Sequence, residues 1–166
     1  MLKLSLAALD RGEARVQERV PPGDPMFEGM AAELAAPLDV DLAARSVGDG
    51  VFVRGTLRTT VRLACRRCLS PVERPVDETV DFLYLERVEG DLDGEVYVLP
   101  ERGDELDLSA AVREHLLLDV PEYGLCSEEC RGLCPGCGAN LNEGACDCVP
   151  PPAPGAWDAL KTIKFD

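Results

Sequence analysis

Hydrophobic and polar residues alternate with a period of two through the middle of the chain. The alternation is clearest from Val51 to Leu63, and shorter stretches from Leu38 to Val47 and from Val72 to Leu85 are strand-like. Such a pattern is typical of half-buried strands. Gly48-Asp49-Gly50 lies between the strands predicted at 38–47 and 51–63. We interpret it as a hairpin turn, since glycine supplies the positive φ that such turns require. We therefore predict an antiparallel β meander or a partly closed, barrel-like sheet, and Val96 to Leu99 is compatible with a further short strand.

The period changes to that of a helix after the strands. Apolar residues fall on one helical stripe at Leu108, Val112 and Leu116. Either Asp107 or Ser109 can cap the start, and Pro121 stops the helix, so we expect it near residues 107–119. Strands followed by one main helix indicate the α+β class.

The length of 166 residues is that of about one domain. We expect a β-rich body over residues 1–121 and a Cys-rich metal module over residues 122–149. Residues 150–166 would form a Pro-rich spacer and a short C-terminal tail, in which we expect Trp157 to pack onto the body.

Cysteine is concentrated near the C-terminus, with six of the eight cysteines between Cys126 and Cys148. Disulfide scaffolds and metal sites both use cysteine at this density. The first residues lack the long apolar core of a secretory signal, and no window approaches the ~20 apolar residues of a membrane span. We therefore expect a cytoplasmic protein without membrane contact, where thiols act as metal ligands.

The spacing of the cysteines favours structural zinc. Cys134-Pro-Gly-Cys137-Gly resembles a zinc knuckle, and our first choice is a four-thiolate site within the cluster. The remaining two ligands would come from Cys126, Cys130, Cys146 and Cys148. Alternatively, Cys65 and Cys68 join the cluster, and eight cysteines fill two sites.

Catalysis by these cysteines is disfavoured. Four thiolates leave no open coordination position on the metal for a Lewis-acid reaction. The only histidine, His115, lies in the predicted helix and is expected at its surface or boundary. Cys65-Arg66-Arg67-Cys68 follows a strand and does not open a helix, unlike a thioredoxin-type motif. We expect no catalytic residue, no enzyme activity and no small-molecule substrate.

The charge is strongly negative, −14, but unevenly distributed. Acidic residues concentrate between Glu86 and Asp107, whereas the predicted strands and the CxxC carry arginines: Arg54, Arg58, Arg62, Arg66 and Arg67. The first three project from one strand face and could contact phosphate. In the alternative interpretation they lie on a solvated sheet face, paired with the acidic segment.

Three strings together resemble the YceD family of large ribosomal RNA subunit accumulation proteins: CRRCLSPVERPVDETV, LDLSAAVREHLLLDVPEYGLC and CRGLCPGCGANLNEGACDC. The resemblance implies a non-enzymatic cytoplasmic factor that supports 23S ribosomal RNA accumulation and large-subunit assembly. It would bind large-subunit rRNA, a large-subunit ribosomal protein, or both. A zinc-module adaptor that binds a protein partner without RNA contact is the alternative.

Overall fold

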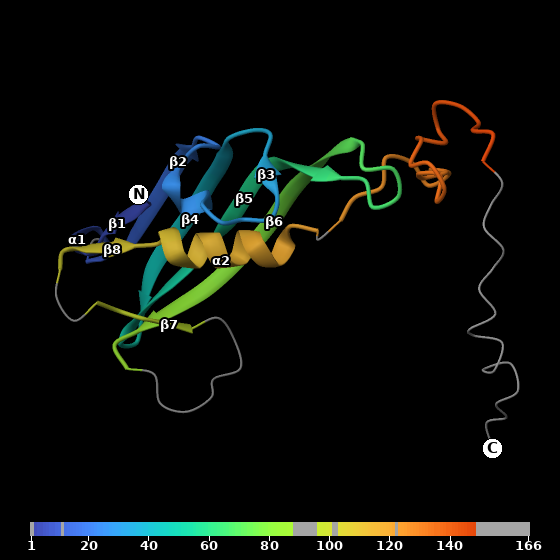
Figure 1. The fold of residues 1–166 in the computed structure, drawn as a ribbon. Coiled ribbons are helices and arrows are strands. Elements are labelled where there is room, and N and C mark those ends of the chain that lie inside the picture. The colour runs from blue at the N-terminus through green and yellow to red at the C-terminus, as the bar shows by residue number, and fades with distance from the viewer. Residues whose placement is uncertain (1, 11, 88–95, 101–102, 122, 149–166) are drawn as a thin grey trace, which may run out of the picture.

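The structure is a computed structural model that describes residues 2–10, 12–87, 96–100, 103–121 and 123–148 (Figure 1). The spacer and tail predicted for residues 150–166 lie outside the described residues.

One large sheet forms the body. Its strands are β2 (Glu13–Val20), β3 (Glu33–Leu34), β4 (Leu38–Val47), β5 (Gly50–Ala64), β6 (Pro71–Leu85) and β7 (Val96–Val98). The strand order is β2-β4-β5-β6-β7, and β3 pairs with β5 beyond the end of β4. The three long predicted strands are confirmed, to within one residue at each end.

The structure distinguishes the two predicted arrangements of the sheet. The sheet is open, because no pairing within the described residues joins β2 to β7, so the meander of β4, β5 and β6 is confirmed and the barrel-like alternative is wrong. It is also not purely antiparallel, since β7 runs parallel to β6, with Leu83 opposite Val96. A three-residue strand carries too little pattern to reveal its direction.

Several elements outside the long strands went unpredicted, including β2 and β3. β1 (Lys3–Ser5) pairs with β8 (Glu105–Asp107) in a separate two-stranded sheet. The helix α1 (Leu6–Leu9) lies between β1 and β2, and the 3-10 helix η1 (Pro25–Phe27) lies between β2 and β3. Except for the eight-residue β2, each is shorter than the stretch over which periodicity can be recognised.

The main helix, α2 (Ser109–Asp119), lies across one face of the sheet (Figure 1). The predicted stripe is confirmed, since Leu108, Val112 and Leu116 are fully buried. Opposite them, the inward face of β5 buries alternate residues, including Val53, Leu57 and Val61. This shared core holds the sheet and α2 together.

The start of α2 differs in detail from the expectation. Leu108 occupies the N-cap position, and the Asp107 carboxylate accepts the Ser109 backbone N–H at 2.9 Å. The hydroxyl oxygen of Ser109 instead accepts the backbone N–H of Leu2, at 3.0 Å. His115 is buried, contrary to our expectation, with its ring 5.1 Å from that of Phe82.

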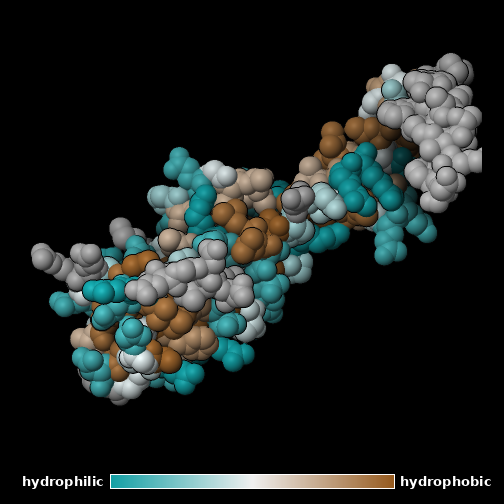
Figure 2. All heavy atoms as spheres, turned by 90° about the horizontal axis from the view of Figure 1, so that it is seen from below, coloured by the Kyte–Doolittle hydropathy of each residue, from teal (hydrophilic) through white to brown (hydrophobic). Residues whose placement is uncertain are grey.

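The Cys-rich segment lies beyond the end of the β5–β6 hairpin, away from β7 (Figure 1). In the space-filling view a narrowing separates this segment from the body (Figure 2). Neither helix of the described chain is long and apolar enough to span a membrane.

Candidate metal centres

The first CxxC forms the turn that joins β5 to β6. Leu69, the residue after Cys68, has a φ of +62°, which L-residues rarely adopt. Its backbone N–H donates to the carbonyl of Cys65 at 2.9 Å. Backbone N–H groups of Arg67 and Cys68 point at the Cys65 sulfur.

The second CxxC repeats this turn. Gly138 follows Cys137 with a φ of +73° and donates its N–H to the Cys134 carbonyl at 2.8 Å. The N–H groups of Gly136 and Cys137 point at the Cys134 sulfur, the former at 3.3 Å. Two segments far apart in the sequence therefore present paired sulfurs with the same backbone geometry.

Leu69 and Gly138 share a left-handed backbone conformation, and substitutions at these two positions should affect metal binding differently. Gly138→Ala places a Cβ in that conformation and should cost ~1–2 kcal/mol, roughly a tenfold loss in zinc affinity measured by chelator competition. Leu69→Gly relieves similar strain but makes the unfolded chain more flexible, so we expect affinity to change little.

Gly144→Ala is the matched control, because a Cβ there meets nothing within 4 Å and its φ is not positive. Equal losses for Gly138→Ala and Gly144→Ala would contradict the proposed role of the knuckle geometry.

The eight cysteines assemble into two groups of four. The first comprises Cys65, Cys68, Cys126 and Cys130, and the second comprises Cys134, Cys137, Cys146 and Cys148. Within each group the sulfurs lie within 4.8 Å of one another. This arrangement matches the alternative in which Cys65 and Cys68 join the cluster and eight cysteines fill two metal sites.

The sulfur spacing fits a tetrahedral ion. Zn–S bonds of about 2.3 Å place tetrahedral sulfurs about 3.8 Å apart. The structure has 3.8 Å between the Cys65 and Cys130 sulfurs and 3.6 Å between those of Cys68 and Cys126. Each group of four thiols could therefore hold a metal ion.

The two groups differ in their surroundings. In the first, Cys65, Cys68 and Cys130 are buried, and a small apolar cluster with Val72 and Leu125 surrounds them. In the second, only Cys134 is buried, and Cys137 and Cys148 are exposed. The first group also joins the sheet to the C-terminal segment, whereas the second spans only residues 134–148.

Arg67 braces the first group. Its guanidinium donates to the carbonyls of Glu128 and Cys130, at 2.9 and 3.0 Å. Its own carbonyl accepts the Leu133 N–H at 3.0 Å. A Cβ on Gly132, whose φ is +75°, would approach that carbonyl oxygen to 3.0 Å. Arg67, predicted as an RNA contact, thus already serves to hold the Cys-rich segment against the CxxC turn.

Arg66 is placed differently. Its guanidinium lies 4.8 Å from the centre of the Tyr123 ring, a cation–π contact. Both side chains are exposed, and Tyr123 retains 56% of its accessible surface. The backbone N–H of Arg66 donates to the Gly124 carbonyl at 3.0 Å, which anchors the pair beside the first cysteine group.

Hydrogen bonds split the thiol pKa values within each group. The backbone N–H of Cys126 is the main cause that lowers the pKa of Cys65 to about 6, and that of Cys137 lowers the pKa of Cys134 to about 6. Hydrogen bonding with the Cys130 side chain raises the pKa of Cys126 to about 12, and the Cys137 side chain does the same for Cys148. Each group at pH 7 thus combines thiolate and thiol.

Metal binding should therefore release protons. A thiol with a pKa of about 12 carries its proton at pH 7, and the ion must displace it. We expect at least one proton per ion and an affinity that falls at least tenfold per unit as pH is lowered towards 6. Below pH 6 the dependence should steepen, because Cys65 and Cys134 also become protonated.

Calorimetric zinc titrations in buffers of different ionisation enthalpy measure the protons released at each pH. An observed enthalpy that does not depend on the buffer would contradict this expectation.

The comparisons with known proteins identify the family. The sequence model of the YceD family, described as large ribosomal RNA subunit accumulation protein YceD, matches residues 53–164, about two thirds of the chain. The chain belongs to the YceD family. The match includes all eight cysteines and α2.

Relatives share parts of this YceD chain. An uncharacterized protein of Mycobacterium tuberculosis is 34% identical over 117 residues, which are 69% of this chain and 56% of the relative. A maize protein, the chloroplastic large ribosomal RNA subunit accumulation protein YCED homolog 1, is 29% identical over 126 residues, 58% of this chain and 43% of its own. The chain spans about half the length of the curated relatives it matches. No solved structure matches it.

The predicted arginine stripe lies on the sheet face opposite α2 and is paired with carboxylates. Arg58 contacts Asp77 at 2.9 Å, and Arg62 contacts Glu73 at 3.0 Å. Arg54 lies opposite Asp81 in the register of β5 and β6. Arg62 also lies 3.9 Å from Glu33 of β3. Among the described residues, the stripe's acidic partners therefore come from β6 and β3, whereas in the solvated alternative we had expected them from the acidic segment after β6.

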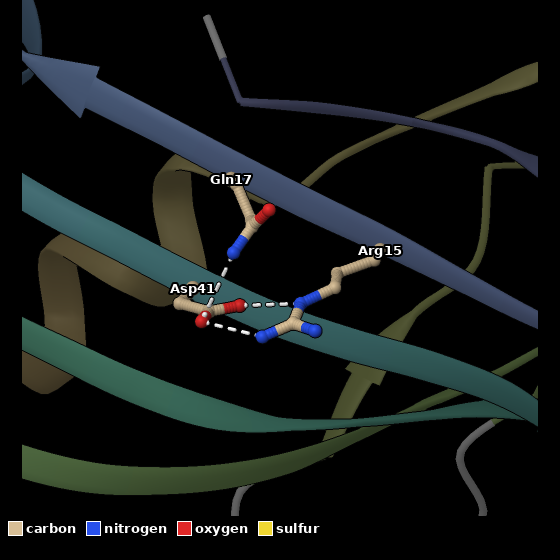
Figure 3. Close-up of polar contacts among 3 residues, drawn as sticks. All are labelled: Arg15, Gln17 and Asp41. Carbon is tan, nitrogen blue, oxygen red and sulfur yellow. Dashed lines mark hydrogen bonds and ion pairs between the residues drawn. The ribbon is translucent and has the colours of Figure 1, made fainter.

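Charges of both signs alternate over this whole face of the YceD sheet. In Figure 3, Arg15 of β2 holds Asp41 of β4 through two hydrogen bonds of 2.8 and 2.7 Å, and Gln17 adds a third at 3.2 Å. The hydrogen bonds from Arg15 are the main cause that lowers the pKa of Asp41. Six arginines and seven carboxylates share the face: Arg15, Arg19, Arg45, Arg54, Arg58, Arg62, Glu13, Glu33, Asp39, Asp41, Glu73, Asp77 and Asp81. The positive and negative charges on this face therefore nearly cancel, with a small negative excess.

Proposed function

We propose that this chain is a ribosome biogenesis factor that supports 23S rRNA accumulation and large-subunit assembly. It would act without catalysis, by binding large-subunit rRNA, a large-subunit ribosomal protein, or both. Membership of the YceD family carries this proposal, since the family is described by its effect on large ribosomal RNA. The printed name of the maize relative refers to the same process.

Zinc is the metal we propose for both cysteine groups. Four thiolates in tetrahedral array select zinc over magnesium or calcium, which prefer oxygen ligands. The ions would have a structural role, because a closed four-thiolate shell leaves no position for a reacting molecule. They would fold a segment whose apolar cluster is too small to fold alone.

For RNA contact we propose the exposed arginines at and near the first CxxC, with Arg66 as the leading residue. The Arg67 guanidinium is bound to backbone carbonyls, and the charges of Arg58 and Arg62 are each balanced by a carboxylate. Arg66 instead presents its guanidinium at the surface on an exposed tyrosine ring. An aromatic ring beside a cation suits an unstacked base with its phosphate, the usual target of sequence-specific RNA recognition.

In vivo crosslinking in growing cells, read by sequencing and by mass spectrometry, tests the proposal. We expect crosslinks to large-subunit rRNA that Arg66→Glu reduces strongly. Arg19→Glu, on the sheet face where Arg19 is paired with Asp39, is the matched control and should leave them unchanged. In vitro, loss of a phosphate contact should lower the slope of log affinity against log salt by ~0.7–0.9.

A protein adaptor without RNA contact is the second candidate function. The net charge of −14 opposes the approach of RNA, and the sheet face offers no positive field to offset it. In this case crosslinking would recover a basic ribosomal protein and no rRNA. That outcome, together with an Arg66→Glu variant whose crosslinks match those of the unaltered chain, would overturn direct RNA binding.

A further inference from the structure

A small apolar pocket opens where the body meets the Cys-rich segment. It has a volume of about 140 Å³ and lies between the C-terminal end of α2, the loop before β3 and the end of β5. Its walls are apolar: Met30, Ala32, Leu63, Leu117, Val120 and Pro121. Hydrophobic side chains gather on the body beside the narrowing (Figure 2).

The rim of this pocket is incompletely covered. Leu117 lines it and is 42% exposed, and the neighbouring Leu118 is 70% exposed. Leaving such a surface in water is unfavourable, and burying a large apolar side chain contributes ~1.5–3 kcal/mol. An apolar side chain from outside the described residues would therefore be bound favourably.

We propose that the pocket receives Trp157 from the chain's own C-terminal tail. This is the single tryptophan, and Leu160 and Ile163 follow it at three-residue steps. The match to the YceD family extends to residue 164, so this apolar run belongs to the part of the chain shared with the family. The pocket volume is on the scale of one large side chain.

The second cysteine group links the start of the tail to the body through the first group, and the length of the tail sets how far Trp157 can reach. Leu63 in the pocket wall precedes the ligand Cys65 by two residues. Cys65 and Cys130 are in contact, and Cys134 follows Cys130 by four residues in the group that ends at Cys148. Nine residue steps separate Cys148 from Trp157, and at the ~3.1 Å per residue of an extended Pro-rich chain they can span up to about 28 Å.

Intrinsic fluorescence tests this directly, because one tryptophan reports on one site. In the zinc-loaded full chain at low concentration, we expect blue-shifted emission that acrylamide quenches slowly. Leu117→Glu places a charge at the pocket wall and should shift the emission to the red and increase quenching several-fold. Leu118→Glu is the matched control, since Leu118 is the next residue but is absent from the pocket wall, and it should change neither.

Several outcomes would overturn the proposal. Solvent-exposed emission in the unaltered chain would do so, as would equal emission from the Leu117→Glu and Leu118→Glu variants. A blue shift that appears only as concentration rises would indicate docking into a second copy. Circular dichroism checks folding, and the milder Leu117→Ser replaces Leu117→Glu if the latter unfolds.

Discussion

Cys68→Ser is expected to lower the zinc content from two ions per chain to one. Cys68 lies in the turn between β5 and β6, and its three proposed co-ligands are Cys65, Cys126 and Cys130, so its loss opens that site. Structural zinc sites contribute ~10–16 kcal/mol of apparent binding free energy, and an incomplete ligand set forfeits much of it. Native mass spectrometry measures the stoichiometry.

The same variant should also detach the Cys-rich segment from the body. The first group joins the β5–β6 turn to Cys126 and Cys130, some 60 residues later in the chain. Without that ion, residues 123–133 should lose protection in hydrogen exchange, while the core of β5 stays protected. The second group, which is local, should remain loaded.

Cys137→Ser is the matched control. It also removes one ion, but from the second group, and should leave residues 123–130 and the β5–β6 turn protected. A wild-type chain with one ion, or a Cys68→Ser variant that retains two, would contradict the assignment of the ligands.

The body of the fold could be predicted from the sequence because its signals are local. Alternation from Leu38 to Leu85 reports which side of each strand is buried, and the structure buries those residues. The Leu108, Val112 and Leu116 stripe reports α2 in the same way. In both cases residues within one element contain the whole pattern.

The grouping of the cysteines could not be predicted because it depends on tertiary contacts. The knuckle spacing identifies Cys134 and Cys137, but nothing near Cys65 indicates that it meets Cys130. The sequence contains only half of a signal for this grouping. Leu69 and Gly138 each follow a CxxC and both have a positive φ in the structure, but only the glycine indicates this conformation in the sequence. The leucine conceals a repeat that a second glycine would have made visible.

Arginine roles were equally hidden. Arg54, Arg58 and Arg62 form a basic stripe in the sequence, but antiparallel register brings a carboxylate opposite each of them. A stripe on one strand therefore says little about the charge of a sheet face until its neighbours are known. Arg67 illustrates the same point, since its carbonyl partners come from Glu128 and Cys130.

Gly55→Ala should destabilise the body by about 3 kcal/mol, because this strand position has no room for a side chain. A Cβ there would lie 2.0 Å from the Asp41 carbonyl oxygen and 2.7 Å from the Leu42 Cα. Both atoms belong to the backbone of β4, so relief requires β4 and β5 to separate. The alternation pattern treats this residue as one more inward position and does not reveal the constraint.

Urea unfolding followed by circular dichroism measures the loss, and Gly23→Ala, where a Cβ meets nothing within 4 Å, is the control. We expect the control to stay within about 0.5 kcal/mol of the unaltered protein. Zinc at the second group should survive Gly55→Ala, because its ligands all lie in residues 134–148, outside the sheet. Joint loss of both ions with the sheet would show instead that the module depends on the body for its fold.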